Sequence, residues 1–329
     1  RVGSRAVRLL AVGRSVLPDP HVLCDTGRRA REAPVPVVTG TERRSALGGA
    51  ANVAANVAAL GASCALVGAV GDDSEGDAFR NELAVARLES THLITGAGRP
   101  TTSKTRVLAR GQQVVRIDDE VDTMLAAADR DRLTAMLLDA LADADALLLE
   151  DYNKGALAPA LIHAAMEAAR KRGIPTVVDP KYRQFFEYAG ATVFKPNRRE
   201  LETALGAAVD LQHRNALPEA LTRLQVDNLL LTLGAEGMVL ITKDRKVSHI
   251  PSIAREVYDV SGAGDTVTAW AGTALAAGAT VLEADQLATY GSGVEVEKAR
   301  VSPVMCDGLR AGPAVGYGRM GRLRRGRLV

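Results

Sequence analysis

Short apolar runs alternate with longer helical stretches through the middle of the chain. Each run ends in polar or glycine residues, which is typical of a buried strand. The runs lie at residues 64–70, 145–151, 175–180, 191–197 and 228–234. A stretch between two of them, residues 160–173, is rich in alanine and closes on Gly173, a favoured residue at a helix C-terminus. Strands that alternate with helices predict a parallel sheet covered by helices on both faces.

Three segments outside this alternation also have strand character. The N-terminal stretch, residues 1–13, contains a short apolar segment that suits a strand better than a signal sequence. Residues 32–49 and 101–120 are rich in β-branched residues and alternate in polarity. These last two segments predict a small sheet that projects from the main domain and is suited to act as a lid.

Polar residues follow several of the predicted strands. In parallel α/β sheets, ligands bind beyond the carboxyl ends of the strands, so these residues predict one functional edge. They are Asp72, Asp151, Asn153, Asp179, Lys181, Asn197 and Gly234. The alternative for each single residue is that strand ends are polar because loops face water.

Residues 48–62, GGAANVAANVAALGA, begin with two glycines and continue with a helical pattern. Asn52 and Asn56 lie one turn apart on the same helix face. Because an asparagine amide both donates and accepts hydrogen bonds, these side chains suit the hydroxyl groups of a sugar. The alternative is a tightly packed alanine helix that carries two ordinary asparagines.

The stretch DVSGAGDT, residues 259–266, predicts a glycine loop that leads into a helix. Backbone N–H groups at a helix N-terminus favour an anion. Asp265 falls in the first turn, where its carboxylate could accept a proton from a substrate hydroxyl during phosphoryl transfer. The alternative is that Asp265 only starts the helix, a position that aspartate favours.

Two further motifs suit a nucleotide and its metal ion. In KPNRRE, Asn197 and Glu200 lie one turn apart, so both side chains could contact a metal–phosphate complex from the same side. TLGAEG, residues 232–237, is a glycine turn at a strand end that suits nucleotide phosphates. Neither motif is specific by itself.

Composition narrows the range of partners. The chain has 329 residues, with 3% aromatic residues and a formal net charge of +2, which disfavours a base-stacking nucleic-acid surface. The three cysteines are Cys24, Cys64 and Cys306; their number and spacing fit neither a disulfide framework nor a zinc site, so we expect a cytoplasmic protein. No apolar stretch is long enough to span a bilayer, and we expect no membrane partner.

The motifs occur in the order in which they occur in the ribokinase/phosphofructokinase-B family of sugar kinases, which the chain resembles over residues 32–298. They are Gly48–Asn52, VGAVGDD at 67–73, Asp179–Pro180, Asn197–Glu200, Thr232–Gly237 and DVSGAGD at 259–265. Within the family the chain is most similar to the D-glycero-β-D-manno-heptose-7-phosphate kinases of the lipopolysaccharide heptose pathway. That similarity lies in residues 32–38, 103–118, 150–157, 177–181 and 255–266.

The resemblance implies a fold and a reaction. The fold is a ribokinase-like three-layer α/β/α sandwich with a mostly parallel sheet and a small β-sheet lid. We expect a kinase domain over residues 1–303, with lid segments at about 14–47 and 100–120, and a disordered tail over residues 304–329, which are rich in arginine and glycine. The reaction is ATP- and Mg²⁺-dependent phosphorylation of the anomeric hydroxyl of heptose 7-phosphate, by a homodimer that associates through the lid.

The resemblance and the residue patterns together predict the site. Asp265 is the general base, and the backbone amides of Gly262, Ala263 and Gly264 stabilise charge on the transferred group. The predicted substrate-binding residues are Gly48, Gly49, Asn52, Lys104, Arg106, Asp151 and Asn153. The predicted nucleotide-binding residues are Lys181, Asn197, Thr232, Gly234 and Gly237. Glu200 is expected to help place Mg²⁺ through water.

The sequence departs from the family at two places. Arg14 and Pro18 stand where relatives carry two sugar-binding acids, and Asp19 or Asp25 could substitute for them. Thr289 stands near the adenine pocket where relatives carry asparagine. These departures leave two alternatives open: another sugar or nucleoside kinase of this family, or a catalytically weak binding protein with this fold.

Overall fold

The structure is a computed structural model of the whole chain, and most of its residues can be described. The described residues are 7–13, 15–16, 21–29, 36–96, 98–109, 112–211, 213, 216–254, 261–297 and 303–304. Arg14, Pro18 and Asp19 lie outside them, as does the predicted tail from residue 305 onward. For Asp25 only the backbone is described, so the proposed substitutes for the sugar-binding acids stay predictions.

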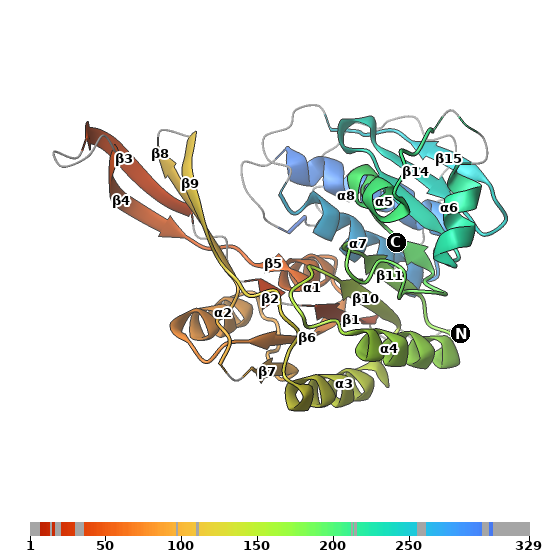
Figure 1. Cartoon of the computed structure of the whole chain (residues 1–329), viewed down its shortest axis with the longest axis horizontal. Coiled ribbons are helices and arrows are strands. Elements are labelled where there is room, and N and C mark those ends of the chain that lie inside the picture. The colour runs from red at the N-terminus through yellow and green to blue at the C-terminus, as the bar shows by residue number, and fades with distance from the viewer. Residues whose placement is uncertain are drawn as a thin grey trace.

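A nine-stranded sheet forms the centre of the molecule (Figure 1). Its strands are β1 (Arg8–Gly13), β6 (Ser63–Val70), β7 (Leu93–Thr95), β10 (Ala146–Glu150), β11 (Thr176–Asp179), β12 (Val193–Phe194), β13 (Leu229–Thr232), β14 (Met238–Ile241) and β15 (Val247–Ile250). Their order is β15-β14-β13-β12-β11-β10-β1-β6-β7. The pairs β13–β14 and β14–β15 are antiparallel, and the other pairs in this sheet are parallel. The predicted mostly parallel sheet is confirmed, as are the predicted strands, including the one near the N-terminus.

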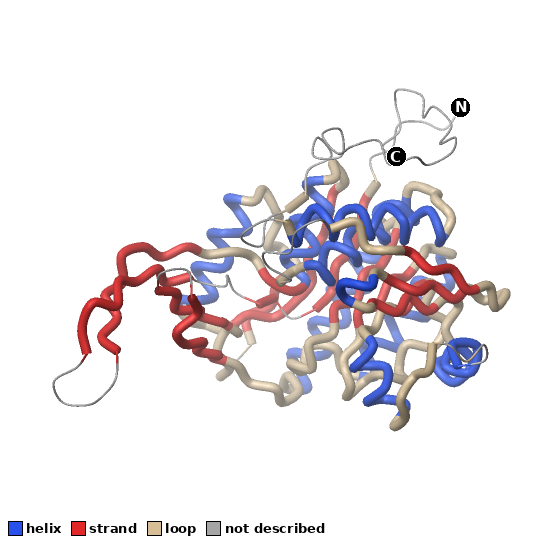
Figure 2. Tube along the Cα trace, turned by 90° about the horizontal axis from the view of Figure 1, so that it is seen from above, coloured by secondary structure: helices blue, strands red, loops and turns tan. Residues whose placement is uncertain are grey.

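Helices cover both faces of this sheet (Figure 2). They are α1 (Ala50–Ala59), α2 (Ser74–Val85), α3 (Ala127–Leu141), α4 (Pro159–Arg172), α5 (Arg198–Leu205), α6 (Ala216–Leu224), α7 (Ala263–Ala276) and α8 (Val281–Val296). Side chains of β1 alternate between two hydrophobic clusters. Leu10 and Val12 pack in the cluster that includes α3 to α6, whereas Leu9 and Ala11 pack in the cluster that includes α1, α2, α7 and α8. Burial on both faces explains why the central strands are apolar without interruption.

Residues 32–49 and 101–120 contribute three strands to a separate four-stranded sheet, and residues 21–29 contribute the fourth. Its strands are β3 (His21–Arg29), β4 (Pro36–Arg44), β8 (Ser103–Ala109) and β9 (Gln112–Asp119), in the order β4-β3-β8-β9. This sheet projects from one end of the molecule (Figures 1 and 2). The small projecting sheet is therefore confirmed, while its action as a lid and the proposed domain boundaries stay predictions.

The base of the projecting sheet is held to the main body by Arg99. Its guanidinium donates to the backbone oxygens of Val121, Thr123 and Lys154. Glu120, which follows β9, also forms a salt bridge with Lys154 of the main body. These contacts hold the base of the strands β8 and β9 against the main body.

Helix ends are specified locally. Gly173 ends α4 in the left-handed conformation, with φ 66°, as its sequence position predicts. Asn197 and Glu200 form a reciprocal capping box at the start of α5. Among the described residues, no helix is both long and apolar enough to span a bilayer.

Candidate active site

The carboxyl ends of three neighbouring strands bring the first elements of the site together. In the parallel pairs, Gly13 of β1 lies opposite Glu150 of β10, and Glu150 lies opposite Asp179 of β11. An added Cβ at Gly13 would lie 2.5 Å from the backbone oxygen of Glu150, so close packing at this edge requires glycine. The sequence predicted a functional edge here. It assigned Asp151 to that edge and missed Glu150, the residue before it.

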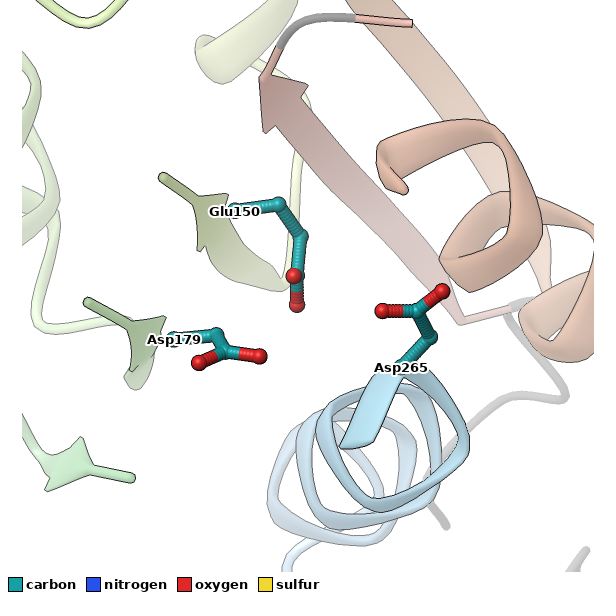
Figure 3. Close-up of side chains that lie close together, drawn as sticks. All are labelled: Glu150, Asp179 and Asp265. Carbon is teal, nitrogen blue, oxygen red and sulfur yellow. The ribbon is translucent and has the colours of Figure 1, made fainter. Parts of the chain in front are cut away.

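The glycine loop leads directly into α7. Gly262 is the N-terminal cap residue and has φ 80°, a conformation that glycine adopts without strain. The first turn closes with a hydrogen bond from the Thr266 N–H to the Gly262 oxygen, 2.9 Å long. Asp265 lies in this first turn and is only 6% exposed. The predicted loop-to-helix geometry is therefore present, and Asp265 points from it toward the strand ends (Figure 3).

Two side chains hold the carboxylate of Asp265. Asn52 of α1 donates from Nδ2 to Oδ2 at 2.9 Å, and the Tyr152 hydroxyl donates to Oδ1 at 2.6 Å. Burial is the largest influence and raises the pKa of Asp265, while these two hydrogen bonds lower it in part. Asn52 was predicted to belong to the site. Tyr152 was missed, although its position two residues after the end of β10 is a signal that could have found it.

Three carboxylates from three elements converge beside this loop (Figure 3). One oxygen each from Glu150, Asp179 and Asp265 lies within 4.8 Å of the other two. Glu150 is fully buried, and burial followed by the charges of Asp179 and Asp265 raises its pKa well above the usual value. The cluster is therefore a concentration of negative charge inside the protein.

Lys195 supplies positive charge to this cluster. It follows β12, is 3% exposed, and its Nζ lies 2.9 Å from Oδ2 of Asp179. Burial lowers the pKa of Lys195, but Asp179 and Glu150 raise it, and the net shift is upward. A Cβ added at Gly264 would lie 3.5 Å from Nζ, so the glycine loop packs against this lysine. Sequence reasoning missed Lys195, whose signal was a lysine that directly follows a buried strand.

The predicted nucleotide and metal residues also gather in one place. Lys181 forms a salt bridge with Oε1 of Glu200, and its Nζ lies 3.8 Å from Asp179. Oε2 of Glu200 accepts the Asn197 N–H at 2.9 Å within the capping box. The side-chain oxygen of Asn197 in turn accepts the Glu200 N–H. Since both oxygens of Glu200 already have partners, its arrangement fits a magnesium ion held through water better than direct ligation.

The glycine turn after β13 lies next to this group. Asn197 and Thr232 form a parallel β-bridge, which places the turn beside the start of α5. Gly237 has φ 89°, and an added Cβ there would lie 2.2 Å from the backbone oxygen of Ile250. At Gly234 an added Cβ would meet no atom within 4 Å. The structure therefore brings the predicted nucleotide residues together, and their role stays a prediction.

The remaining predicted substrate residues have structural contacts of their own. Asp151 accepts hydrogen bonds from the Asn153 N–H at 2.7 Å and from the Tyr188 hydroxyl at 2.9 Å. Oδ1 of Asn153 accepts from the Arg183 N–H at 3.2 Å. These bonds shape the loop after β10 and account for both residues without a ligand, so substrate binding by Asp151 and Asn153 stays a prediction.

Lys104 and Arg106 lie on the projecting sheet, on one face of β8. Opposite them in β9 stand Asp118 and Arg116. The Nζ of Lys104 lies 3.8 Å from Glu120. Gly48 and Gly49 form the short strand β5 at the start of α1, where it pairs with β2 (Ser15–Val16). The two glycines therefore lie near Asn52. Lys104 and Arg106 lie on the projecting sheet, so their distance from Asn52 depends on the position of that sheet.

Thr289, which stands where relatives carry asparagine, lies on α8 and is buried. Its hydroxyl donates to the backbone oxygen of Asp285 at 2.8 Å and lies 3.7 Å from the sulfur of Met238. Asp285 is fully buried, and burial raises its pKa well above the usual value. The Thr289 hydroxyl therefore has its hydrogen-bond partner within α8, which explains how threonine fits at this position.

Comparison with known proteins gives one consistent picture. The model of the pfkB family carbohydrate kinases matches residues 21–304. The bifunctional protein HldE of Azorhizobium caulinodans is 41% identical over 304 residues, which is 92% of this chain and 64% of that protein. HldE of Rhodospirillum rubrum is 39% identical over 307 residues, 93% of this chain and 62% of that protein. The chain therefore spans less than two thirds of the length of these relatives.

Solved structures show the same fold at low sequence identity. Arabidopsis thaliana ribokinase, in complex with ribose and ATP, matches with a TM-score of 0.71 and 21% identity, over 91% of this chain and 96% of that chain. Phosphofructokinase-2 from Escherichia coli, in complex with potassium, matches with a TM-score of 0.73 and 16% identity, over 93% of this chain and 97% of that chain. The predicted three-layer ribokinase-like fold is thereby confirmed.

Proposed function

The chain belongs to the pfkB family of carbohydrate kinases, and on this basis we propose that it transfers the γ-phosphoryl group of ATP to the anomeric hydroxyl of D-glycero-D-manno-heptose 7-phosphate. The product would be heptose 1,7-bisphosphate, a precursor for ADP-heptose and the lipopolysaccharide core. Identity of about 40% to HldE proteins over more than nine tenths of the chain supports this choice within the family. We also propose a cytoplasmic location, on the cysteine pattern and the need for ATP.

The observation that carries the proposal is the buried carboxylate of Asp265 at the N-terminus of α7. Tyr152 and Asn52 fix its orientation by hydrogen bonds to its two oxygens. A base held in one orientation can accept the proton of the sugar hydroxyl as the phosphoryl group arrives. Because burial raises the pKa of Asp265, its affinity for that proton exceeds that of an exposed aspartate.

The glycine loop suits the transferred group. The N–H groups at the start of α7 and the positive end of the helix dipole would stabilise the charge that develops there. Lys181 and Glu200 lie on the side of Asp179 where the nucleotide residues gather. Magnesium bound with ATP would neutralise phosphate charge, and we assign Glu200 to hold it through water.

A substrate panel tests the function. Purified protein would be given Mg-ATP and one of heptose 7-phosphate, ribose, fructose 6-phosphate or a nucleoside, and ADP release would be measured. We expect turnover with heptose 7-phosphate at a kcat/KM well above those of the other substrates. Turnover of ribose or fructose 6-phosphate alone would reassign the substrate. A protein that binds ATP but turns over no substrate would contradict enzymatic function.

The Tyr152→Phe variant should move the pH dependence of the reaction. The Tyr152 hydroxyl stabilises the ionised form of Asp265, so its removal raises the pKa of that carboxyl. Since the base must be ionised, the acidic limb of the kcat profile is expected to shift to higher pH. The kcat–pH profile measures this shift directly.

Tyr188→Phe provides the matched control for this experiment. Tyr188 also donates a hydrogen bond to a buried aspartate, but the acceptor is Asp151. Its loss should leave the acidic limb in place. An equal shift in both variants, or no shift in Tyr152→Phe, would show that Tyr152 does not tune the base.

We propose that the protein is a homodimer that associates through the projecting sheet. Val115 and Ile117 of β9 are 45% and 56% exposed and lie on one face, because alternate residues of a strand share a face. Val107 of β8 stands opposite Val115 on that face. An exposed apolar face on a projecting element suits burial against a second copy.

Ile117→Lys is therefore expected to give a monomer where the wild type is a dimer, since a charge would be buried at the interface. Light scattering after size exclusion measures the mass. The control is Gln113→Lys. A bulge between Val107 and Leu108 interrupts the alternation, so that Gln113 pairs with Leu108, the neighbour of Val107 on the opposite face of the sheet. A wild-type monomer, or a dimer that persists in Ile117→Lys, would contradict association through this face.

A further inference from the structure

Glu120 stands where the projecting sheet joins the main body, and it contacts a lysine on each side of that junction. It directly follows β9, at the end where the strand meets the body (Figure 1). Lys154 of the main body forms a salt bridge with Oε1 of Glu120. Lys104 of β8 lies on the other side, with its Nζ 3.8 Å from Oε2. One carboxylate therefore links the main body to a residue of the projecting sheet that is predicted to bind substrate.

The neighbouring acid on β9 does not hold Lys104 in this way. Asp118 stands opposite Lys104 in the register of β8 and β9, where a cross-strand ion pair is expected. Both oxygens of Asp118 instead accept hydrogen bonds from Arg116, at 2.8 and 2.9 Å. Glu120 is therefore the carboxylate that forms a salt bridge with Lys104 in the described part of the chain.

The carboxylate of Glu120 is fixed from the side of the main body. The Lys154 side chain is only 15% exposed, and the backbone oxygen of Lys154 accepts a hydrogen bond from Arg99 at 3.0 Å. Lys154 also lies two residues after Tyr152, whose hydroxyl donates to Asp265. The short loop after β10 therefore contacts the candidate base with one residue and Glu120 with another.

The second oxygen of Glu120 is directed to Lys104. Oε2 is buried and accepts no hydrogen bond from the described residues. The Nζ of Lys104, at 3.8 Å, lies just beyond the range of an N–H···O hydrogen bond, which ends at about 3.2 Å. Because a buried oxygen without a donor is unfavourable, this ammonium group is drawn toward Oε2. A fixed carboxylate thus limits where the flexible lysine side chain places its charge.

The three side chains together keep a positive charge. Two ammonium groups share one carboxylate, so one positive charge is left over for another anion. The substrate of the proposed reaction carries such an anion, because its phosphate is separate from the hydroxyl that reacts. A charge-assisted hydrogen bond from Lys104 to this phosphate would contribute to binding and not to the chemical step.

We propose that Glu120 is a positioning residue that holds the ammonium group of Lys104 in place for the phosphate of the sugar phosphate. It acts through Lys104 and does not contact the reacting atoms. The proposal rests on the proposed function, because it needs a phosphorylated sugar as the substrate. Without the charge of Glu120, the ammonium groups of Lys104 and Lys154 repel each other, and Lys104 regains the many conformations of an unrestrained side chain.

Glu120→Gln tests this role, because glutamine keeps the shape of the side chain and removes its charge. We expect the KM for heptose 7-phosphate to rise by about 3- to 30-fold, within the range of coupling between residues in contact. The value of kcat should change little, since Asp265 and the predicted nucleotide residues are untouched. An unchanged KM would overturn the proposal. A lower KM would overturn it as well, because it would show that Glu120 only competes with the phosphate for Lys104.

The double variant of Glu120→Gln with Lys104→Met shows whether Glu120 acts through Lys104. If it does, the loss of Glu120 has no further effect once Lys104 is replaced. The KM of the double variant should therefore equal that of Lys104→Met alone. Two effects that multiply in the double variant would be independent of each other and would overturn the proposal.

Asp119→Asn is the matched control. Asp119 directly precedes Glu120, is exposed, and stands opposite Ser103, so it lies on the other face of β9 from Asp118. Its replacement changes the net charge of the protein by the same amount as Glu120→Gln. The KM should stay at the wild-type value. An equal change of KM in both variants would be a general effect of charge and would overturn the positioning role.

Glu120→Asp covers the case in which Glu120→Gln does not fold. Aspartate keeps the charge but withdraws the carboxylate from both ammonium groups, so the KM should rise here as well, and a wild-type KM would overturn the proposal. The wild type separates this proposal from the proposed function. If it phosphorylates heptose 7-phosphate and the Glu120 variants keep its KM, only the role of Glu120 is overturned. If it accepts only unphosphorylated sugars, both proposals are overturned.

Discussion

Asp265→Asn is expected to reduce kcat by about 10²- to 10⁴-fold, the range associated with loss of a general base. The carboxylate is held by Tyr152 and Asn52 at the N-terminus of α7. Asparagine has nearly the same shape but cannot accept the proton of the sugar hydroxyl. Steady-state assays of ADP release with heptose 7-phosphate measure the effect.

Binding of ATP is the control for this variant. Because the predicted nucleotide residues lie around Glu200 and Thr232, the affinity for ATP measured by calorimetry should change little. An unchanged thermal midpoint would show that the fold is intact. Activity close to that of the wild type would contradict the assignment of Asp265 as the base, and a parallel loss of ATP binding would point to a structural role instead.

Lys195→Met should have the largest effect on stability. The lysine is 3% exposed, and its Nζ lies 2.9 Å from Asp179. Loss of one partner of a buried ion pair leaves the other charge unpaired, which lowers the free energy of unfolding by about 3–5 kcal/mol. Here the change also leaves three neighbouring carboxylates without that ammonium group. Denaturation in urea, followed by circular dichroism, measures the loss.

Lys246→Met is the matched control for Lys195→Met. The pair of Lys246 and Asp244 has a similar length, 2.7 Å, but the Lys246 side chain is 81% exposed. Water and salt screen such a pair, so its loss should leave the urea midpoint almost unchanged. If both variants lost the same amount of stability, burial would not be the reason for the importance of Lys195.

Lys195→Met should affect the reaction as well. The charge of Lys195 lowers the pKa of Asp265 in the folded protein. Without it the carboxyl holds its proton more tightly, so at low temperature, where the variant stays folded, the acidic limb of activity should move to higher pH. A profile that stays in place would show that Lys195 acts on stability alone.

Much of the architecture could be predicted from local sequence pattern. The apolar run at 145–151 contains β10, and the run at 175–180 contains β11, because burial on both sheet faces selects apolar residues at every position. Gly173 marks the end of α4, because glycine adopts the left-handed conformation there without strain. The order of motifs indicated the family, and the glycine loop before Asp265 indicated the start of α7.

The assembly of the site could not be predicted in this way. Asn52 and Asp265 are 213 positions apart, and Tyr152 is 113 positions from Asp265, yet all three are in contact. The order of strands in the sheet and their register place Glu150 beside Asp179. Neither property is encoded in the pattern of a single segment. The positions of Tyr152 and Lys195 just after buried strands marked them as polar residues at strand ends, but no local pattern showed that they contact Asp265 and Asp179.

The sequence by itself determined the class of fold, the positions of most strands and helices, and the loop that carries the candidate base, because these depend on periodicity and on the conformational limits of single residues. Only the tertiary structure decided which charges meet. It engaged Glu200 in a helix cap and a salt bridge, and it enclosed Glu150 beside the carboxylates of Asp179 and Asp265. Electrostatic environment depends on distances across the sheet, and those distances exist only once the chain has folded.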